Sequence, residues 1–494
     1  MNVLLLPLDS RPCNCRWPEQ MLSHAGHTCI KPAPEDMDYF RRPAEFEAQR
    51  RFLNENANRA DCFVLSVDKL CYGSLLASRD DLTDLKTAFD RLNTVKEIKR
   101  KYPSLAIHAV SVIMRASVSA LCGGELSTYN NMSLYSLYSG IERYYCEKGN
   151  QKAQKHFAAL AQRHKALMDE DTVKRYHYVR ERNHALNMEC VRMCADGTFS
   201  SLLLLQEDAA KYGFHTAEQS ELKTLVRETG AKNAFLHNGA DEGCCMAAMR
   251  AVNRDRIRLD IRYSYGLGGF TALYEDRPFN VNLADSLLYQ SIRQDASAPV
   301  RLVIHAPVHN RQTEAAAQNE CSEDINKTIA LIRDGLTHGK KVYLLDVAYA
   351  NGGSLRLISA LKSEGLLSAI DGYSAWNTAG NSLGSMLSSI VSDSAAGCSD
   401  HLFKWERIID DALYEAMLRQ RLTAAVSEKG DDPLNLKDPN YAQNLLTGEL
   451  SALFECENWP LTLKSDNPRS CPYTVTASLP WNRLFEVDIR VGNA

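Results

Sequence analysis

Short apolar runs, each ending abruptly in polar residues and mostly followed by a helix-like segment, dominate this chain. Continuous apolar runs of this length are typical of strands buried on both faces of a parallel sheet. Alternation of such strands with helices predicts an α/β protein, and the number and even spacing of the runs favour a TIM-like (β/α)8 barrel over an open doubly wound sheet. The continuous runs lie at residues 3–8, 62–67, 106–114, 201–205, 300–305, 342–345 and 368–370, and another short one begins at Ala234. Residues 257–263 instead alternate apolar and charged residues, and together these segments predict about eight strands.

Two segments depart from this alternation. Residues 125–195 are rich in Tyr, Lys, Arg and Gln, and their pattern predicts long amphipathic helices. Residues 401–428 read as helical, with Trp405, Ile408, Ile409 and Leu413 on one stripe, while 473–478 and 485–491 resemble strands. We therefore predict a catalytic barrel over residues 1–400 with a helical insertion, and a C-terminal extension over 401–494 packed on it.

Composition argues against several kinds of partner. A formal charge of −4 and a pI near 6.4 provide no basic field that would favour nucleic acid or an anionic membrane. No apolar run is long enough to span a bilayer, and the N-terminus lacks the basic region of a signal peptide. Exposed apolar residues between 126 and 167 could form a homodimer face or the insertion's own core.

The cysteines indicate a reducing cellular compartment and do not indicate a metal site. The chain has 15 cysteines and no secretion signal, so we expect thiols in a reducing cytoplasm. Cys13, Cys15, Cys244 and Cys245 lack the spacing of a structural zinc site.

Polar side chains stand at the end of nearly every run. In a barrel, all strand C-termini meet at one rim, so these groups would share one pocket; in an open sheet they would lie along an edge. The strand-end residues are Asp9, Arg11, Asp68, Lys69, Arg115, Glu207, Asp208, Asp241, Glu242, His305, Asp346 and Asn377.

Two tandem acidic pairs, Glu207-Asp208 and Asp241-Glu242, are the catalytic candidates. Glycoside hydrolysis needs two carboxyl groups, one acting as acid and the other as base or nucleophile. In a known variant the substrate's own 2-acetamido oxygen attacks, one carboxylate orients the acetamide and its neighbour is the acid, which suits a tandem pair. The alternative is that both pairs cap the helices that follow them.

The remaining strand-end groups are predicted to bind substrate. The arginines and Lys69 could anchor it or neutralise the carboxylates. Trp376 beside Asn377 suits the face and the hydroxyl groups of a sugar, although the indole could equally be a core residue. The predicted substrate-binding residues are Asp9, Arg11, Asp68, Lys69, Arg115, His237, Asp346, Asn351, Trp376 and Asn377.

No cofactor is expected. The glycine-rich loop 266–269 does not match the dinucleotide fingerprint, and no Walker lysine motif occurs. His237, His305 and His309 could join Asp208, Asp241 or Asp346 around a metal ion, but no histidine pair has the HExxH type of spacing. A metal-dependent hydrolase is therefore the alternative enzyme, and a non-catalytic sugar-binding protein is the alternative outside catalysis.

Residues 8–12, 66–73, 239–242 and 376–381 together resemble a bacterial family catalogued as domain of unknown function 4127, and the resemblance runs from residue 4 to about residue 489. That family name implies a single conserved unit and no particular chemistry.

Residues 237–242 are also similar to the His-x-Gly-Gly-Asp-Glu signature of the family 20 β-N-acetylhexosaminidases, departing from it at Ala240. That resemblance implies that Asp241 orients the acetamide and that Glu242 is the general acid/base. The related family 84 O-GlcNAc hydrolases carry a tandem acidic pair after strand four, where Glu207-Asp208 stands in this chain. We therefore predict a cytoplasmic glycoside hydrolase that acts on a small N-acetylhexosamine-containing carbohydrate, with the choice of acidic pair left open.

Overall fold

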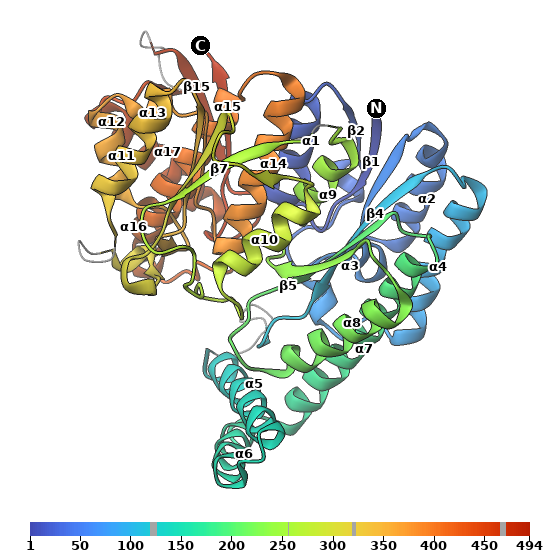
Figure 1. Ribbon diagram of the computed structural model, residues 1–494. Coiled ribbons are helices and arrows are strands. Elements are labelled where there is room, and N and C mark those ends of the chain that lie inside the picture. Colours follow the sequence, from blue (N-terminus) through green and yellow to red (C-terminus); the bar gives the residue numbers. More distant parts are fainter. Residues whose placement is uncertain (119–125, 255, 319–322, 465–470) are drawn as a thin grey trace. The chain divides into compact units, whose positions relative to one another are not determined.

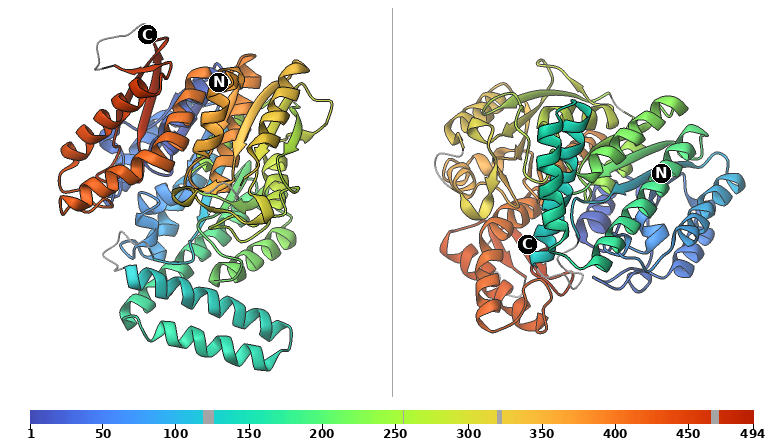
Figure 2. Two further views of the ribbon diagram at one scale, coloured as in Figure 1. Left: turned by 90° about the vertical axis from the view of Figure 1, so that its left-hand side faces the viewer. Right: turned by 90° about the horizontal axis from the view of Figure 1, so that it is seen from below.

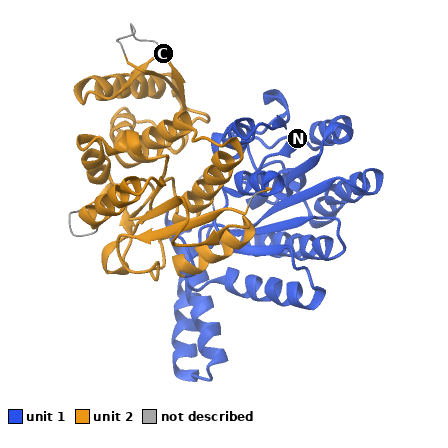
Figure 3. Cartoon of the chain, turned by 45° about the horizontal axis from the view of Figure 1, so that its top comes forward, with its two compact units in different colours: residues 1–253, 274–277 blue, residues 254–273, 278–494 orange. Residues whose placement is uncertain are grey.

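The chain forms two compact α/β units, each built on its own parallel sheet (Figure 3). The computed structural model describes residues 1–118, 126–254, 256–318, 323–464 and 471–494. Unit 1 comprises residues 1–253 and 274–277, and unit 2 comprises residues 254–273 and 278–494. The predicted boundary at residue 400 does not coincide with this division, because residues 401–494 belong to unit 2 as a whole.

Unit 1 has a six-stranded parallel sheet in the order β2-β1-β3-β4-β5-β6 (Figure 1). Side chains in mid-strand, such as Leu4, Val64 and Leu203, are fully buried, as their continuous apolar runs predict. The strands are β1 Asn2–Leu6, β2 Thr28–Ile30, β3 Cys62–Ser66, β4 Ala106–Ile113, β5 Ser201–Gln206 and β6 Ala234–Asn238.

Helices cover both faces of this sheet. Alternate strand residues such as Leu6 and Leu204 share one hydrophobic core with α2, α4, α7 and α8, while α1 and α9 pack against each other and α9 contacts β3, β4 and β5. The helices are α1 Pro12–His24, α2 Phe46–Asn56, α3 Val67–Tyr72, α4 Leu85–Lys101, α5 Leu126–Glu147, α6 Gln151–Lys165, α7 Glu170–Ala195, α8 Phe214–Thr229 and α9 Gly243–Val252.

The first residue of α9 has to be small. A Cβ atom on Gly243 would lie 2.5 Å from a methyl group of Leu205 and 2.7 Å from one of Val110. The glycine lets the helix backbone approach the sheet closely, directly after the acidic pair Asp241-Glu242.

The predicted helical insertion is confirmed as α5, α6 and α7. Helices α5 and α6 form an antiparallel pair (Figures 1 and 2). Met132 from α5, Ala161 from α6, and Val173 and Tyr176 from α7 form a small core of their own. This is the second of the two roles that the sequence suggested for the apolar residues of the insertion, although Leu126 and Leu167 remain exposed.

Unit 2 has a five-stranded parallel sheet in the order β13-β11-β9-β7-β8. Its strands are β7 Arg258–Tyr263, β8 Arg293–Gln294, β9 Val300–His305, β11 Lys341–Asp346 and β13 Gly372–Ser374, with β10 Thr313–Glu314 and β12 Tyr349–Ala350 forming a separate pair. Its helices before residue 400 are α10 Phe279–Tyr289, α11 Ile325–Thr337, α12 Leu355–Ser363, α13 Leu366–Ala369 and α14 Ala379–Ala396.

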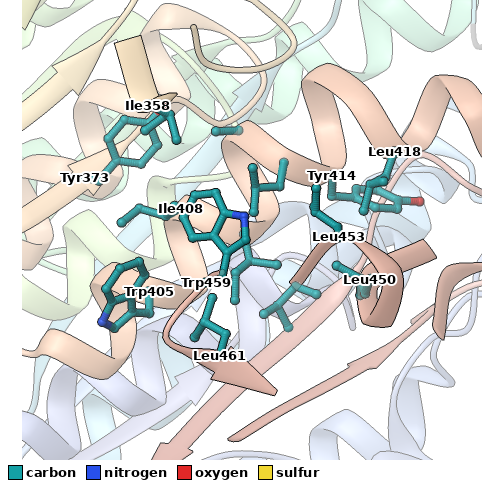
Figure 4. Packing of buried hydrophobic residues seen from close by; sticks show 14 of the residues in the cluster. Ile358, Tyr373, Trp405, Ile408, Tyr414, Leu418, Leu450, Leu453, Trp459 and Leu461 are labelled. Atoms are coloured by element: carbon teal, nitrogen blue, oxygen red, sulfur yellow. The ribbon is translucent and has the colours of Figure 1, made fainter. Parts of the chain in front are cut away.

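Residues 401–494 share a core with this sheet. Trp405, Trp459 and Leu461 pack in one cluster with Val303 and Tyr373 (Figure 4). The predicted helix 401–428 is confirmed, with a π-helical middle, a form that is rare outside functional or strained segments. The elements are α15 His401–Arg407, the π-helix Ile408–Leu418, α16 Arg419–Glu428, α17 Pro439–Cys456, and a sheet of β14 Leu461–Leu463, β15 Tyr473–Ser478 and β16 Asp488–Asn493.

Two sequence predictions about the fold are wrong. The described strands form open sheets and not a closed (β/α)8 barrel, although neighbouring strands do follow one another in sequence as in a barrel. Two short strands that the sequence analysis missed, β2 and β8, occupy the outer sides of β1 and β7. The predicted strand 368–370 is mostly α13, and the true strand, β13, begins at Gly372.

Candidate active site at the carboxyl edge of unit 1

The strand order of the unit 1 sheet reverses between β1 and β3. After β1 the chain passes through α1 to β2 on one side, while β3 and the later strands extend on the other side. In open α/β sheets, ligands bind outside the carboxyl ends of the strands at such a switch point. The predicted residues Asp9, Arg11, Asp68 and Lys69 follow β1 and β3, so they lie at this position.

Arg11 joins the loop after β1 to the loop after β6. Its guanidinium donates to Asp9 at 2.7 Å and to both carboxylate oxygens of Asp241, at 2.5 and 3.1 Å. Asn14 also donates to Asp9, at 3.0 Å. Burial raises the pKa of Asp9, but the Arg11 guanidinium outweighs it and holds that pKa below its usual value. All of these groups are buried, so the guanidinium is sandwiched between two carboxylates.

Glu242 differs from its neighbour Asp241. Its Oε2 accepts a hydrogen bond from the backbone N–H of Ala240 at 3.0 Å, and its Oε1 has no hydrogen-bond partner in the described part of the chain. Burial raises the pKa of Glu242 to about 8. At neutral pH the carboxyl group of Glu242 is therefore largely protonated, while its neighbour Asp241 is ion-paired with Arg11.

The turn before the pair is shaped around Glu242. Gly239 has φ +131°, and a Cβ atom there would lie 1.8 Å from Oε1 of Glu242. Only glycine tolerates both the backbone conformation and this contact. The chain turns at Gly239 after β6, and this turn leaves room for the carboxyl group of Glu242 against the backbone of Gly239.

The second acidic pair is neutralised by arginines. Arg79 pairs with Glu207, and Arg115 pairs with Asp208 and lies 4.0 Å from Glu207. Burial raises the pKa of Glu207, the two arginines oppose that rise, and the charges of Asp208 and Asp241 add to it. The two acidic pairs therefore interact electrostatically within one site.

Lys69 and Asp68 occupy the first turns of α3. The ammonium group of Lys69 is fully buried and pairs with Asp38 at 2.5 Å. Burial raises the pKa of Asp38, and the ammonium opposes it. Asp68 accepts a hydrogen bond from the N–H of Val112 at 2.9 Å, and its burial raises its pKa to about 7.

His237, the remaining predicted residue in unit 1, is a buried residue of β6. Its Nδ1 lies 3.0 Å from the carbonyl oxygen of Asn238, and burial lowers its pKa to about 4, so the imidazole is neutral. Within the described residues, no group of three or more His, Cys, Asp or Glu side chains is arranged to hold a metal ion.

The other predicted residues belong to unit 2. Asp346 accepts from the N–H of Ser354 at 2.7 Å and from the hydroxyl of Tyr373 at 3.2 Å, and burial raises its pKa. The N–H of Asn351 donates to the carbonyl of Asn377 at 2.7 Å. Trp376 is 3% exposed, in line with the core role that the sequence left open.

Sequence reasoning missed three residues of the unit 1 site, namely Asp38, Arg79 and Asn14. Asp38 lies in an irregular segment, and Arg79 ends a short 3-10 helix, Ala77–Arg79, beyond the run 62–67, so neither stands directly at a strand end. Asn14 stands on α1, five residues after Asp9, and its position in the first turn after the strand was the available signal.

These features define an α/β protein with a charged, largely buried site at the carboxyl edge of an open parallel sheet. The family described as "Protein of unknown function (DUF4127)" matches residues 3–490, and the chain belongs to that family. Neither a curated protein nor a solved structure matches the chain. Among the described helices, none has the length and hydropathy that crossing a bilayer would require.

Proposed function

We propose that unit 1 is a glycoside hydrolase in which Glu242 is the general acid and Asp241 its charged neighbour. The observation that carries this proposal is the contrast within the tandem pair: both oxygens of Asp241 bind the guanidinium of Arg11, while burial raises the pKa of Glu242 to about 8. Two carboxyl groups whose environments separate their protonation states are the arrangement that glycosidases use.

The substrate is a small carbohydrate that carries an N-acetylhexosamine. In the substrate-assisted mechanism, the acetamido oxygen attacks the anomeric carbon while a carboxylate orients the acetamide N–H. Arg11 uses one lone pair on each oxygen of Asp241, and a carboxylate has about four such acceptor sites in all. Asp241 thus retains acceptor capacity for the acetamide, and Glu242 donates its proton to the leaving oxygen.

Between the two acidic pairs, the contacts favour Asp241-Glu242 for catalysis. Glu207 and Asp208 are ion-paired with Arg79 and Arg115, whereas Glu242 has no ion-pair partner among the described residues. In this proposal, Glu207 and Asp208 position Arg79 and Arg115 at the edge of the site. A cytoplasmic location accompanies the proposal, since the described cysteines are free thiols.

The test is an assay of purified protein on nitrophenyl glycosides of N-acetylglucosamine and N-acetylgalactosamine in both anomers, beside the corresponding glucosides and galactosides. Release confined to an acetamido sugar supports the proposal. Glu242→Gln should lower turnover about 100-fold for a poor leaving group and much less for dinitrophenol, which leaves without a proton. The matched control is Glu228→Gln, at an exposed position of α8.

Two other outcomes identify the alternatives. Turnover that needs an added divalent metal and survives Glu242→Gln would replace this proposal by a metal-dependent hydrolase. Thermal stabilisation by N-acetylhexosamines without release of product, with or without metals, would replace it by a sugar-binding protein.

A further inference from the structure

Unit 2 has a groove of about 1020 Å³ that is lined by none of the predicted catalytic or substrate-binding residues, although His309, one of the metal-ligand candidates, does line it. Its walls include Tyr265, which follows β7, and Val308 and His309, which follow β9. The first turns of α11 and α12 supply Ile325 and Arg356. The groove therefore lies outside the carboxyl ends of the unit 2 strands, where open α/β sheets bind ligands, and its volume is that of a small-molecule site.

Arg356 is the arginine of this groove, and among the described residues it makes one ion pair. Arg356 lies 3.4 Å from Oε1 of Glu323, a contact that uses one of the five guanidinium donors, and its side chain is 42% exposed. Glu323 itself is fully buried, and its Oε2 lies 2.9 Å from Nε2 of His305. Among the described residues Arg356 spends one donor on Glu323, so its other guanidinium donors are available to a ligand.

The other wall presents ring and aliphatic surface. Tyr265 and His309 meet edge to face, with their ring centroids 5.9 Å apart. His309 adopts φ +55°, a left-handed conformation that is uncommon outside glycine and asparagine and that tends to occur at functional positions. Leu355 and Ile325 add aliphatic surface between the rings and Arg356.

The second carboxylate in the groove does not favour a cationic ligand. Asp324 caps α11, and its Oδ1 accepts from the N–H of Lys327 at 2.9 Å. With Oε2 of Glu323 bonded to His305 and Oδ1 of Asp324 bonded to its helix, the guanidinium of Arg356 is the group of the groove that offers a ligand the most hydrogen-bond donors.

We propose that this groove binds a small organic acid, with its carboxylate on Arg356 and its ring or chain against Tyr265 and the aliphatic wall. Arginine suits this role because its planar fork can hold both oxygens of a carboxylate. The site belongs to unit 2 alone and stands independently of the activity proposed for unit 1.

The test uses 4-fluorobenzoate and its neutral partner 4-fluorobenzamide, whose binding to the full chain is measured by ¹⁹F NMR. We expect 4-fluorobenzoate to bind in the millimolar range or more tightly, at least tenfold more tightly than the amide, and less tightly as salt is raised. Arg356→Gln should remove this preference, whereas Arg356→Lys should retain part of it because it keeps the positive charge. Arg333→Gln, which changes an exposed arginine of α11 that pairs with Glu364, should have no effect.

Three results would overturn the proposal. They are equal binding of the two probes, an Arg356→Gln variant that binds 4-fluorobenzoate like the unchanged protein, and no binding of either probe at millimolar concentration. Thermal melting of each variant, compared with Arg333→Gln, shows whether it is folded; Arg356→Lys serves as the test if Arg356→Gln is not.

Discussion

The guanidinium of Arg11 donates a hydrogen bond to each carboxylate oxygen of Asp241, 230 residues further along the chain. The same guanidinium pairs with Asp9 at 2.7 Å. One buried cation thus joins the loops that follow the first and the last strand of the unit 1 sheet. Helix α9, which starts two residues after Asp241, contacts the intervening strands β3, β4 and β5.

Replacing Arg11 by methionine should destabilise the protein by about 3–5 kcal/mol, because it leaves Asp9 and Asp241 buried without their counter-charge. The free energy of unfolding is measured by urea denaturation. The double variant Arg11→Met/Asp241→Asn should recover part of the loss. Arg227→Met, at an exposed position of α8, should change the stability by no more than about 0.5 kcal/mol. Equal effects of Arg11→Met and Arg227→Met would contradict the buried triad.

Glu242 should make the protein less stable as the pH rises. Its pKa is about 8 in the folded chain and about 4.3 when unfolded, so between these values the folded state binds more protons than the unfolded state. The contribution is therefore fully present below pH ~4.3 and is lost as the pH rises to about 8, with a slope approaching 1.4 kcal/mol per pH unit.

Glu242→Gln should remove this slope and should be more stable than the unchanged protein at pH 8. The measurement is urea unfolding at several pH values for both proteins. Parallel pH curves would show that Glu242 titrates normally in the folded chain.

Gly239→Ala should displace the Glu242 carboxyl group, because the new Cβ atom would lie 1.8 Å from its Oε1. We expect a loss of stability of about 2 kcal/mol or more from this clash and the unfavourable φ. Gly197→Ala has a positive φ of 82° but no atom within 4 Å, so it should show the conformational cost alone, about 1 kcal/mol. Similar losses for the two variants, measured by thermal unfolding, would exclude the clash.

Glu323→Gln should weaken unit 2 more at neutral pH than at acid pH. Burial raises the pKa of Glu323, but the hydrogen bond and charge of His305 outweigh it, so the pKa is lowered in the folded chain. The contribution is present above the unfolded value of about 4.3 and is lost as the pH falls through the lower folded value. We expect a loss of about 3 kcal/mol at pH 7 in urea unfolding that shrinks in acid. Glu364→Gln, at a partly exposed ion pair with Arg333, is the control and should cost about 1 kcal/mol or less.

Local patterns in the sequence predicted most of the elements. The run 201–205 became β5, and the segment that ends at Gly230 became α8, with Gly230 in the left-handed conformation expected of a helix C-cap. The short strands β2 and β8 were not predicted because two or three residues are too few to show a period. Without these two strands, the remaining ones alternated regularly with helices, and that regularity favoured a closed barrel.

Which residues end the strands can be read from the order of residues along the chain, because a buried strand requires an apolar run and the polar residue after it marks where burial stops. That order therefore placed Asp9, Arg11, Asp241 and Glu242 at strand ends. The folded structure was needed to show that Arg11 pairs with Asp241, that Asp38 pairs with Lys69, and that burial raises the pKa of Glu242. Ion pairing depends on the distance between side chains from segments far apart in the chain, and protonation depends on how far each group is buried. The spacing of residues along the chain does not predict these distances or this burial.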